Sequence, residues 1–283
     1  MPGVNVPSTS HRVAIQGEHG SFSEEAARRL LGRRVQVTCC ATFPEAFQQL
    51  RSGRARRLVV PVENTLAGSV HENYDLLVEH GFHAEAELDL RIRHALIAPR
   101  GVRLDAVKFV YSHPVALAQC RKFFAKHPRL KAVADYDTAG SVKRIVAEGR
   151  RDAAAIAGPF AAAVYKARIL LRNLEDHPGN FTRFLVIRRD RAARPGPDCD
   201  KTSIVFATKN IPGALFRCLA AFALRDINLT KLESRPWHGR PFEYLFYLDF
   251  IGRPDRAPGR AALAQLGEYT SSVRILGCYP RHR

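Results

Sequence analysis

The run NFTRF, residues 180–184, places side by side two groups that could act on a carboxylic acid. Thr182 carries a hydroxyl that can donate a hydrogen bond, and Arg183 carries a planar fork suited to binding a carboxylate bidentately. If the run is a regular strand, these two side chains point to opposite faces, so only one of them faces a substrate directly. Taken alone, the run is more simply explained as the start of an ordinary strand.

A glycine-bearing segment near the N-terminus has the composition of a ligand-binding turn. The sequence GEHGSFSE spans residues 17–24, directly after an apolar run. Ser21 and Glu24 have the spacing of a capping box, which predicts a helix that begins at Phe22. Glycines let a ligand approach the backbone, and the free N–H groups at a helix start favour a carboxylate or a phosphate. A plain strand-to-helix turn explains the segment equally well.

Similar helix starts recur along the chain. PVENTLAGS (61–69) follows another apolar run, SHP (112–114) puts a proline in a first helical turn, and DTAGS (137–141) begins a further helix. Several helix N-termini could therefore face one site, which suits a small dicarboxylate better than a metal ion. No metal is expected, because four histidines near these segments lack metal-ligand spacing: they are His19, His71, His94 and His113.

The elements that must position these segments follow an α/β rhythm from residue 12 to about 188, with short apolar runs followed by helical patterns. Residues 82–98 partly alternate over a length too great for one ordinary strand, which predicts a crossing from one α/β lobe to another. Residues 181–188 would be the return crossing. Two crossings leave a cleft between the lobes, where small-molecule sites usually lie. The predicted strands cover 13–15, 35–38, 58–62, 107–111, 132–134 and 153–157.

A second unit is expected after residues 189–201, because RDRAARPGPDCDK has the charge, proline and glycine of a linker. Strand patterns then cover 202–208, 228–234, 242–250 and 273–278, and helical patterns cover 212–224 and 258–265. Their order is βαββαβ, the ferredoxin-like split unit.

The charge balance limits the kind of partner. The 283 residues include 44 Lys and Arg against 27 Asp and Glu, a net charge of +17. This excess suits nucleic acid, anionic lipid or an anionic small substrate, or reflects a bias in surface composition alone. Because the basic residues are scattered and no RNA-binding or helix-turn-helix motif accompanies them, we expect no nucleic-acid partner and a positive field that attracts a dianion.

The remaining composition indicates a compact protein with reduced thiols. The six cysteines form no CxxC pair, so they are expected to be buried thiols, although a catalytic cysteine remains an alternative. No apolar run approaches the roughly 20 residues needed to cross a bilayer, so no membrane partner is expected. Residues 1–10 lack both a basic start and an apolar stretch, which predicts a cytoplasmic protein.

The ordered set of motifs resembles the prephenate dehydratase family over residues 11–280. The resemblance is carried by GEHGSFSEEA (17–26), PVENTLAGSV (61–70), SHPVALAQC (112–120), DTAGS (137–141) and NFTRF (180–184). Family members commonly have Pro at the position of Glu18, Thr at Ser21 and Ser at Thr65. The resemblance implies a periplasmic-binding-protein-like catalytic domain at 11–190, with one lobe at about 11–82 plus 180–190 and the other at about 83–179.

The same resemblance assigns roles to residues. The threonine essential to the family falls on Thr182, and substrate binding is expected of Arg183, Phe184, Asn64, Ser21, Ser112 and Thr138. Residues 201–280 resemble an ACT regulatory domain, a module that senses amino acids. Its phenylalanine site is expected to comprise Gly213, Ala214, Leu215, Asn228, Glu233, Ser234, Arg235 and Pro236.

The resemblance implies a hydro-lyase that converts prephenate into phenylpyruvate in phenylalanine biosynthesis, without a cofactor and under feedback by phenylalanine. Arogenate, which carries an amino group where prephenate carries a keto group, is the alternative substrate. A non-catalytic, amino-acid-responsive binding protein is the alternative of another class, because two-lobed clefts and ACT modules both serve as sensors. A homodimer or homotetramer is expected, since the phenylalanine site usually lies at a subunit interface.

Overall fold

The computed structural model describes residues 12–190, 195–209, 211–237, 239–240 and 243–282. The chain divides into two compact units, one formed by residues 1–76 and 88–186 and the other by residues 77–87 and 187–283. The predictions that concern residues 1–11, part of the linker (191–194) and the start of the strand at 242 lie outside the described residues.

The first lobe of the first unit is built on parallel strands. β1 pairs in parallel with both β2 and β3, and the strand order is β11-β3-β1-β2. Val13, Ala14 and Ile15 on β1 are fully buried, which explains the unbroken apolar run in the sequence. The elements are β1 (Arg12–Gln16), α1 (Phe22–Leu31), β2 (Gln36–Cys40), α2 (Phe43–Arg51), β3 (Arg57–Asn64), β4 (Gly68–Ser69) and α3 (His71–Glu79).

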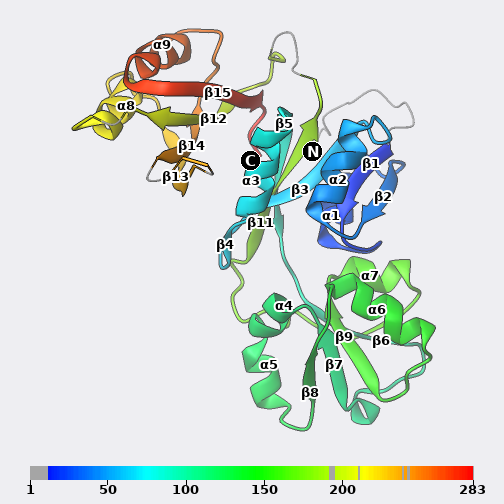
Figure 1. The fold of residues 1–283 in the computed structure, drawn as a ribbon. Coiled ribbons are helices and arrows are strands. Elements are labelled where there is room, and N and C mark those ends of the chain that lie inside the picture. The colour runs from blue at the N-terminus through cyan, green and yellow to red at the C-terminus, as the bar shows by residue number, and fades with distance from the viewer. Residues whose placement is uncertain (1–11, 191–194, 210, 238, 241–242, 283) are drawn as a thin grey trace. The chain divides into compact units, whose positions relative to one another are not determined.

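The second lobe is a five-stranded sheet with helices on both faces (Figure 1). Ala154 and Ile156 pack with Phe123 of α5, whereas Ala153 and Ala155 pack with the core of α6 and α7 on the opposite face. This alternation along one strand is what a sheet covered on both faces requires. The elements are β6 (Ala95–Ala98), η1 (Leu104–Ala106), β7 (Phe109–Ser112), α4 (Pro114–Ala118), α5 (Arg121–Lys126), β8 (Lys131–Ala134), α6 (Thr138–Ala147), β9 (Ala153–Ala157), α7 (Pro159–Val164) and β10 (Arg168–Arg172).

Two crossings join the lobes. The outward crossing contains β5 (His83–Arg91) and continues into β6, and the return crossing is β11 (Phe181–Arg188). The backbone N–H of Ile92 donates to the carbonyl oxygen of Asn180 at 2.8 Å, so the two crossings are hydrogen-bonded where they pass. The two-lobed α/β fold expected from the sequence is therefore confirmed.

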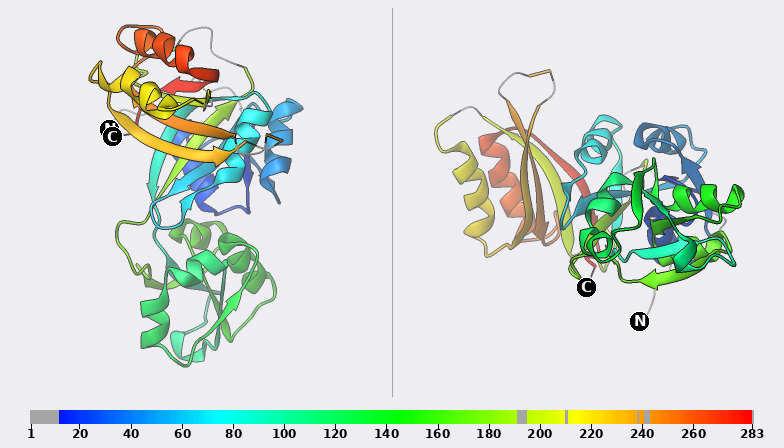
Figure 2. Two further views of the ribbon diagram at one scale, coloured as in Figure 1. Left: turned by 60° about the vertical axis from the view of Figure 1, so that its left-hand side comes forward. Right: turned by 90° about the horizontal axis from the view of Figure 1, so that it is seen from below.

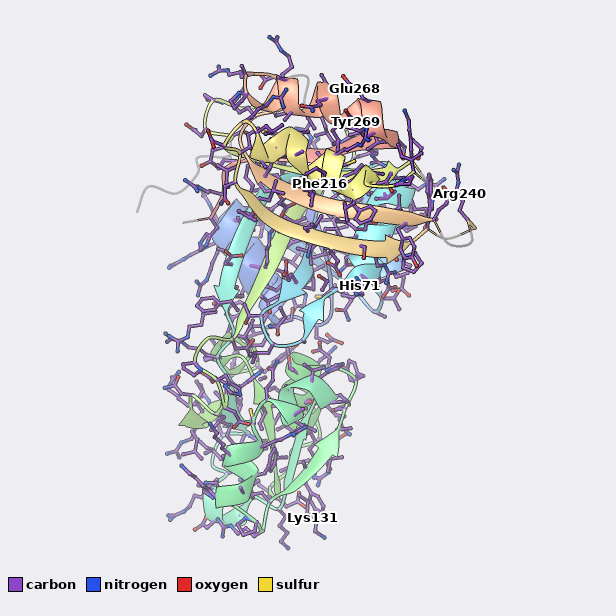
Figure 3. The ribbon with its side chains drawn as sticks, turned by 90° about the vertical axis from the view of Figure 1, so that its left-hand side faces the viewer. His71, Lys131, Phe216, Arg240, Glu268 and Tyr269 are labelled. Carbon is purple, nitrogen blue, oxygen red and sulfur yellow. The ribbon has the colours of Figure 1, made fainter. Side chains whose placement is uncertain are left out.

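The second unit has the predicted βαββαβ order. Its antiparallel strands run in the order β13-β14-β12-β15. Both helices cover one face of this sheet, where Phe222 of α8 and Leu266 of α9 pack on Phe206 and Phe250 (Figure 2). Phe216 of α8 remains 76% exposed (Figure 3). The elements are β12 (Lys201–Thr208), α8 (Ala214–Ala223), β13 (Leu229–Pro236), β14 (Tyr244–Ile251), α9 (Gly259–Tyr269) and β15 (Thr270–Tyr279).

Some elements differ from the sequence-based expectation. The sequence pattern does not predict β10, because Arg168–Arg172 is a short run with charged ends and no glycine or proline boundary. The helix predicted at 212–224 begins only at Ala214, after Gly213 adopts a left-handed conformation with φ of 73°. Lys201 falls within the predicted linker, but it is the first residue of β12 and is buried.

Candidate active site

Thr182 lies on β11 with only 8% of its surface exposed. The side-chain nitrogen of Asn64, at the end of β3, donates to the Thr182 hydroxyl oxygen at 2.9 Å. Within the part of the chain that the structure describes, the Thr182 hydroxyl has no acceptor for its own hydrogen. The hydroxyl is thus held as an acceptor on one side and remains available as a donor on the other.

The orientation of the Asn64 amide is fixed by its own turn. Its oxygen accepts the backbone N–H groups of Leu66 at 3.0 Å and Ala67 at 2.9 Å, so the nitrogen must face β11. That nitrogen also lies 2.8 Å from the side-chain oxygen of Asn180 and 3.0 Å from the carbonyl oxygen of Phe181. Two motifs that lie 116 residues apart therefore meet at Thr182.

A chain of polar side chains continues from Asn64 into the second lobe. Asn180 donates to the side-chain oxygen of Gln119 at 2.9 Å, and His94 lies 3.0 Å from the same oxygen. Burial lowers the pKa of His94, although the Gln119 contact opposes this shift, so the ring is neutral near pH 7. His94 is therefore a buried hydrogen-bonding residue that helps fix the amide chain supporting Thr182.

The predicted helix start after β1 is confirmed, with one change in its hydrogen bonds. Ser21 caps α1 by accepting the backbone N–H of Glu24 at 3.3 Å. In a capping box the Glu24 carboxylate would accept the backbone N–H of Ser21, but here it does not. The carboxylate accepts the N–H of Gly20 at 2.7 Å and pairs with Arg28 at 2.6 Å. It therefore holds in place the loop of residues 17–20, here called the glycine loop.

Glu24 should make the protein sensitive to acid. Burial alone raises its pKa, but the Gly20 hydrogen bond and the Arg28 pair outweigh burial and hold the pKa below the ordinary value of 4.5. A lowered carboxyl pKa contributes stability that is present above the unfolded-state pKa and lost as pH falls through the folded-state value. Glu24→Gln should therefore cost about 1–3 kcal/mol of unfolding free energy at pH 7 and much less near pH 3.

Urea unfolding at both pH values measures this difference, and Glu25→Gln is the matched control. Glu25 pairs with Arg29 on the same helix, but the Arg29 side chain is 58% exposed. Its replacement should cost under about 0.5 kcal/mol at either pH. Equal losses for the two variants would contradict the role given to Glu24.

The glycine loop also contacts the second lobe. Glu18 pairs with Lys143 of α6 at 2.9 Å and accepts a hydrogen bond from the Tyr136 hydroxyl at 3.3 Å. The Tyr165 hydroxyl donates to the carbonyl oxygen of His19 at 2.6 Å. A Cβ at Gly17, which has φ of 102°, would lie 3.2 Å from the Asp137 carboxylate. The loop therefore carries part of the junction between the lobes.

Asp137 stands at this junction as the cap of α6. Its carboxylate accepts the N–H of Gly140 at 2.6 Å, and Thr138 is the first helical residue. Burial raises the pKa of Asp137, and the nearby Glu18 charge adds to that shift. The helix begins where the sequence predicted, with the side chain of Asp137 as its cap.

The other predicted substrate-binding residues lie in different surroundings. Ser112 is fully buried and donates to the carbonyl oxygen of Ile156 at 2.6 Å. Phe184 is 2% exposed and belongs to the core, while Arg183 is half-buried on the opposite side of β11 from Thr182. Sequence reasoning did not single out Asn180 or Gln119 as supports, although both lie inside motifs that carried the resemblance.

The residues of the predicted phenylalanine site are distributed over α8 and β13. Gly213 has a positive φ directly before α8, and a Cβ there would contact nothing within 4 Å. Along β13, Glu233 and Arg235 share the more buried face, whereas Ser234 and Pro236 are exposed on the other face. Ala214 is buried, Leu215 packs on the core, and exposed Asn228 accepts the N–H of Ile251 through its carbonyl oxygen at 2.9 Å.

A reactive cysteine, a metal site and a membrane-spanning helix find little support among the described residues. All six cysteines are free, and burial raises the pKa of Cys39 and of Cys120 to about 12, which disfavours a reactive thiolate. No group of three or more potential ligands among these residues could hold a metal ion. In the same ranges, no helix is both long and apolar enough to cross a membrane.

Comparisons with known proteins identify the family. A model of the family described as prephenate dehydratase matches residues 13–192. This chain belongs to the prephenate dehydratase family. Its members are hydro-lyases of phenylalanine biosynthesis, as the sequence resemblance implied. Arogenate dehydratase/prephenate dehydratase 2, chloroplastic, of Arabidopsis thaliana is 41% identical over 278 residues, which cover 95% of this chain and 72% of the relative.

Solved structures agree with the family membership. The prephenate dehydratase of Arthrobacter aurescens in complex with L-Phe has a TM-score of 0.86 and 30% identity, and the match covers 95% of this chain and 90% of that one. A protein described as GqqA, a novel type of quorum-quenching acylase, has a TM-score of 0.89 and 33% identity over 96% of this chain and 98% of that chain.

The predicted cytoplasmic location is wrong. Several similar proteins from Arabidopsis thaliana are described as chloroplastic, which does not support a cytoplasmic location. The error has a physical reason: cell compartments are chosen by address segments that receptors read, and the chemistry of the folded domains does not encode them. The residues on which the prediction rested lie outside the described ranges.

Proposed function

We propose that this chain removes water and carbon dioxide from prephenate to give phenylpyruvate, with Thr182 as the group that assists the departing hydroxyl. The free donor of the Thr182 hydroxyl carries this proposal, since Asn64 occupies its acceptor side at 2.9 Å. As the ring carboxylate leaves as CO₂, its bonding pair enters the ring and the C–O bond breaks with its pair on oxygen. One proton is consumed, and water and an aromatic ring result.

The hydrogen bond from Thr182 should strengthen as negative charge develops on the departing oxygen. Asn64, Ser21, Ser112 and Thr138 are proposed to bind or orient the dianion, with Asn64 acting also through Thr182. Arg183 and Phe184 are proposed to orient it indirectly by holding β11 in place, because Arg183 lies across the strand from Thr182 and Phe184 lies in the core. Ser112 reaches the substrate in this proposal only if its hydroxyl leaves Ile156, because that bond already uses its hydrogen. The proposed catalytic domain covers residues 11–190 and the regulatory domain residues 201–280.

Arogenate is the close alternative, and it would yield phenylalanine directly. The relatives at 41% identity are described as arogenate dehydratases or as acting on both compounds, whereas the similar bacterial structure is described as a prephenate dehydratase. The deciding experiment compares kcat/KM of the purified protein on prephenate and on arogenate. Turnover of neither, or tight prephenate binding without turnover, would favour the non-catalytic sensor.

The similarity to GqqA supports a second candidate activity, cleavage of the acyl group from a quorum-sensing signal. Mass spectrometry of such a compound after incubation would detect the released acid. The same assay on Thr182→Val separates the two activities. If acyl cleavage and prephenate turnover fall together in this variant, the two activities share the Thr182 site. If only prephenate turnover falls, acyl cleavage takes place at another site.

The second unit is proposed to be an ACT domain that binds phenylalanine between two copies of the chain in a dimer or tetramer. The N–H groups of Leu215 and Phe216 in the first turn of α8 suit the ligand carboxylate, whereas the Ala214 N–H already donates to the Ile211 carbonyl oxygen at 3.2 Å. Differential affinity for two arrangements of the catalytic domain would couple the sites. The related bacterial enzyme bound to L-Phe supports this ligand.

Arg235→Ala tests the regulatory site. We expect the phenylalanine concentration for half-inhibition to rise about tenfold, the effect of losing about 1.4 kcal/mol of binding, while uninhibited kcat stays within twofold. Lys209→Ala is the control, because Lys209 is exposed in the same unit but lies outside the proposed site. Unchanged inhibition in Arg235→Ala would show that this part of β13 does not bind the ligand.

A further inference from the structure

The second lobe carries a hollow lined by cations. Its volume is about 680 Å³, within the range of small-molecule sites. Arg100, Lys166, Arg168 and Arg172 line it together with apolar groups that include Ala163 and Ile169, and no carboxylate is part of the lining. The lining of the hollow is therefore strongly positive and partly apolar.

These four side chains have no polar partner among the described residues. None of the four forms an ion pair or a side-chain hydrogen bond with another described residue, although other arginines of this lobe do so, such as Arg144 with Asp135 at 2.7 Å and Arg150 with Asp152 at 2.8 Å. Arg151 adds a further cation, because its guanidinium lies 3.3 Å from the position of a Cβ at Gly101 in the lining. Like charges gathered without a counter-charge repel one another, and a multivalent anion removes that repulsion.

The hollow is separate from the candidate active site. Gly20 and His19 of the glycine loop contact Ala161 and Tyr165, whereas Ala163 and Lys166 line the hollow. Residues that lie two apart in a helical segment point in different directions. The segment 159–166 thus presents one side to the glycine loop and another to the hollow.

We propose that this hollow binds a small molecule that carries two or more phosphate groups. Arginine forks match phosphate oxygens bidentately, and several cations spaced around one cavity can neutralise several charges at once. The volume suits a small molecule, and Ala163 and Ile169 of the lining would contact its uncharged part. A nucleic-acid strand would need a longer basic groove with aromatic stacking platforms, and no aromatic side chain lines this cavity among the described residues.

Calorimetric titration of the full chain with inorganic tripolyphosphate, at about 0.15 M salt to screen exposed charges, tests the proposal. We expect one site per chain. The double variant Lys166→Asn/Arg168→Gln should lower the affinity for tripolyphosphate tenfold or more, since each lost charge-assisted bond to phosphate is strong. Asn is chosen at 166 because the backbone there is left-handed, with φ of 53°. The control Arg121→Gln/Lys126→Asn removes the same charge from exposed positions in the same lobe and should change affinity less than threefold.

Two further titrations distinguish the hollow from the active site and from a nucleic-acid surface. Saturating phenylpyruvate should leave tripolyphosphate binding intact, and a random single-stranded oligonucleotide should bind the pocket variant and the wild type equally. The proposal fails if tripolyphosphate does not bind at millimolar concentration, if phenylpyruvate displaces it, if both double variants lose affinity alike, or if the oligonucleotide alone requires the pocket cations.

Discussion

Thr182→Val is expected to lower kcat for prephenate by about 10²–10⁴, the usual effect of losing a positioned proton or hydrogen-bond donor. Valine has nearly the shape of threonine and replaces the hydroxyl with a methyl group, so the volume at this buried position changes little, while the Asn64 side-chain nitrogen loses one of its acceptors. The lost interaction forms mainly as the C–O bond breaks, so KM should change much less than kcat. Steady-state kinetics with phenylpyruvate detection gives both constants.

Thr182→Ser is the matched control, since it keeps the hydroxyl and removes a methyl group. It should retain at least a tenth of the wild-type kcat. Asn64 still donates to the serine oxygen if that hydroxyl keeps its place on β11. A loss below threefold in the valine variant would remove Thr182 from the mechanism, and equal losses in both variants would mean that packing, and not the hydroxyl, is responsible.

Lys201→Met should destabilise the second unit by about 3–5 kcal/mol, the usual cost of leaving buried charges without their partner. The ammonium of Lys201 lies 2.8 Å from the Glu87 carboxylate and 3.9 Å from that of Asp249, and all three side chains are at most 10% exposed. The Ser203 hydroxyl donates to Asp249 and lies within hydrogen-bond distance of the Tyr279 hydroxyl, which adds Ser203 and Tyr279 to the cluster. Without the ammonium, two carboxylates remain buried close together.

The single tryptophan makes this prediction measurable in one unit. Trp237 is the only Trp of the chain and belongs to the second unit, so its fluorescence during urea unfolding follows that unit. Lys209→Met is the control, because the exposed side chain of Lys209 bonds only the carbonyl oxygen of Glu268 among the described residues, and its replacement should cost under about 1 kcal/mol. Adding Glu87→Gln to Lys201→Met should recover part of the loss. A single-variant cost below that of the control would show that the cluster does not stabilise the unit.

The sequence by itself determined the family, the two-lobed α/β fold and the βαββαβ order of the second unit. These follow from local signals: unbroken apolar runs such as Val13–Ile15, the capped helix start at Ser21 and the glycine before α8. Such signals depend on neighbours within a few residues. They missed β10 at Arg168–Arg172, where the local pattern is short and charged at its ends.

Tertiary structure alone decided which side chains meet. Thr182 and Arg183 are adjacent in sequence, yet strand alternation buries one and leaves the other half-buried on the opposite face. The partner of Thr182 is Asn64, 118 residues away, and Gln119 reaches Asn180 only because the two crossings bring the lobes together. The cation-lined hollow is likewise assembled from a turn after β6, the segment after α7 and strand β10. Hydrogen bonds and charge clusters depend on distances in space, which no spacing along the chain encodes.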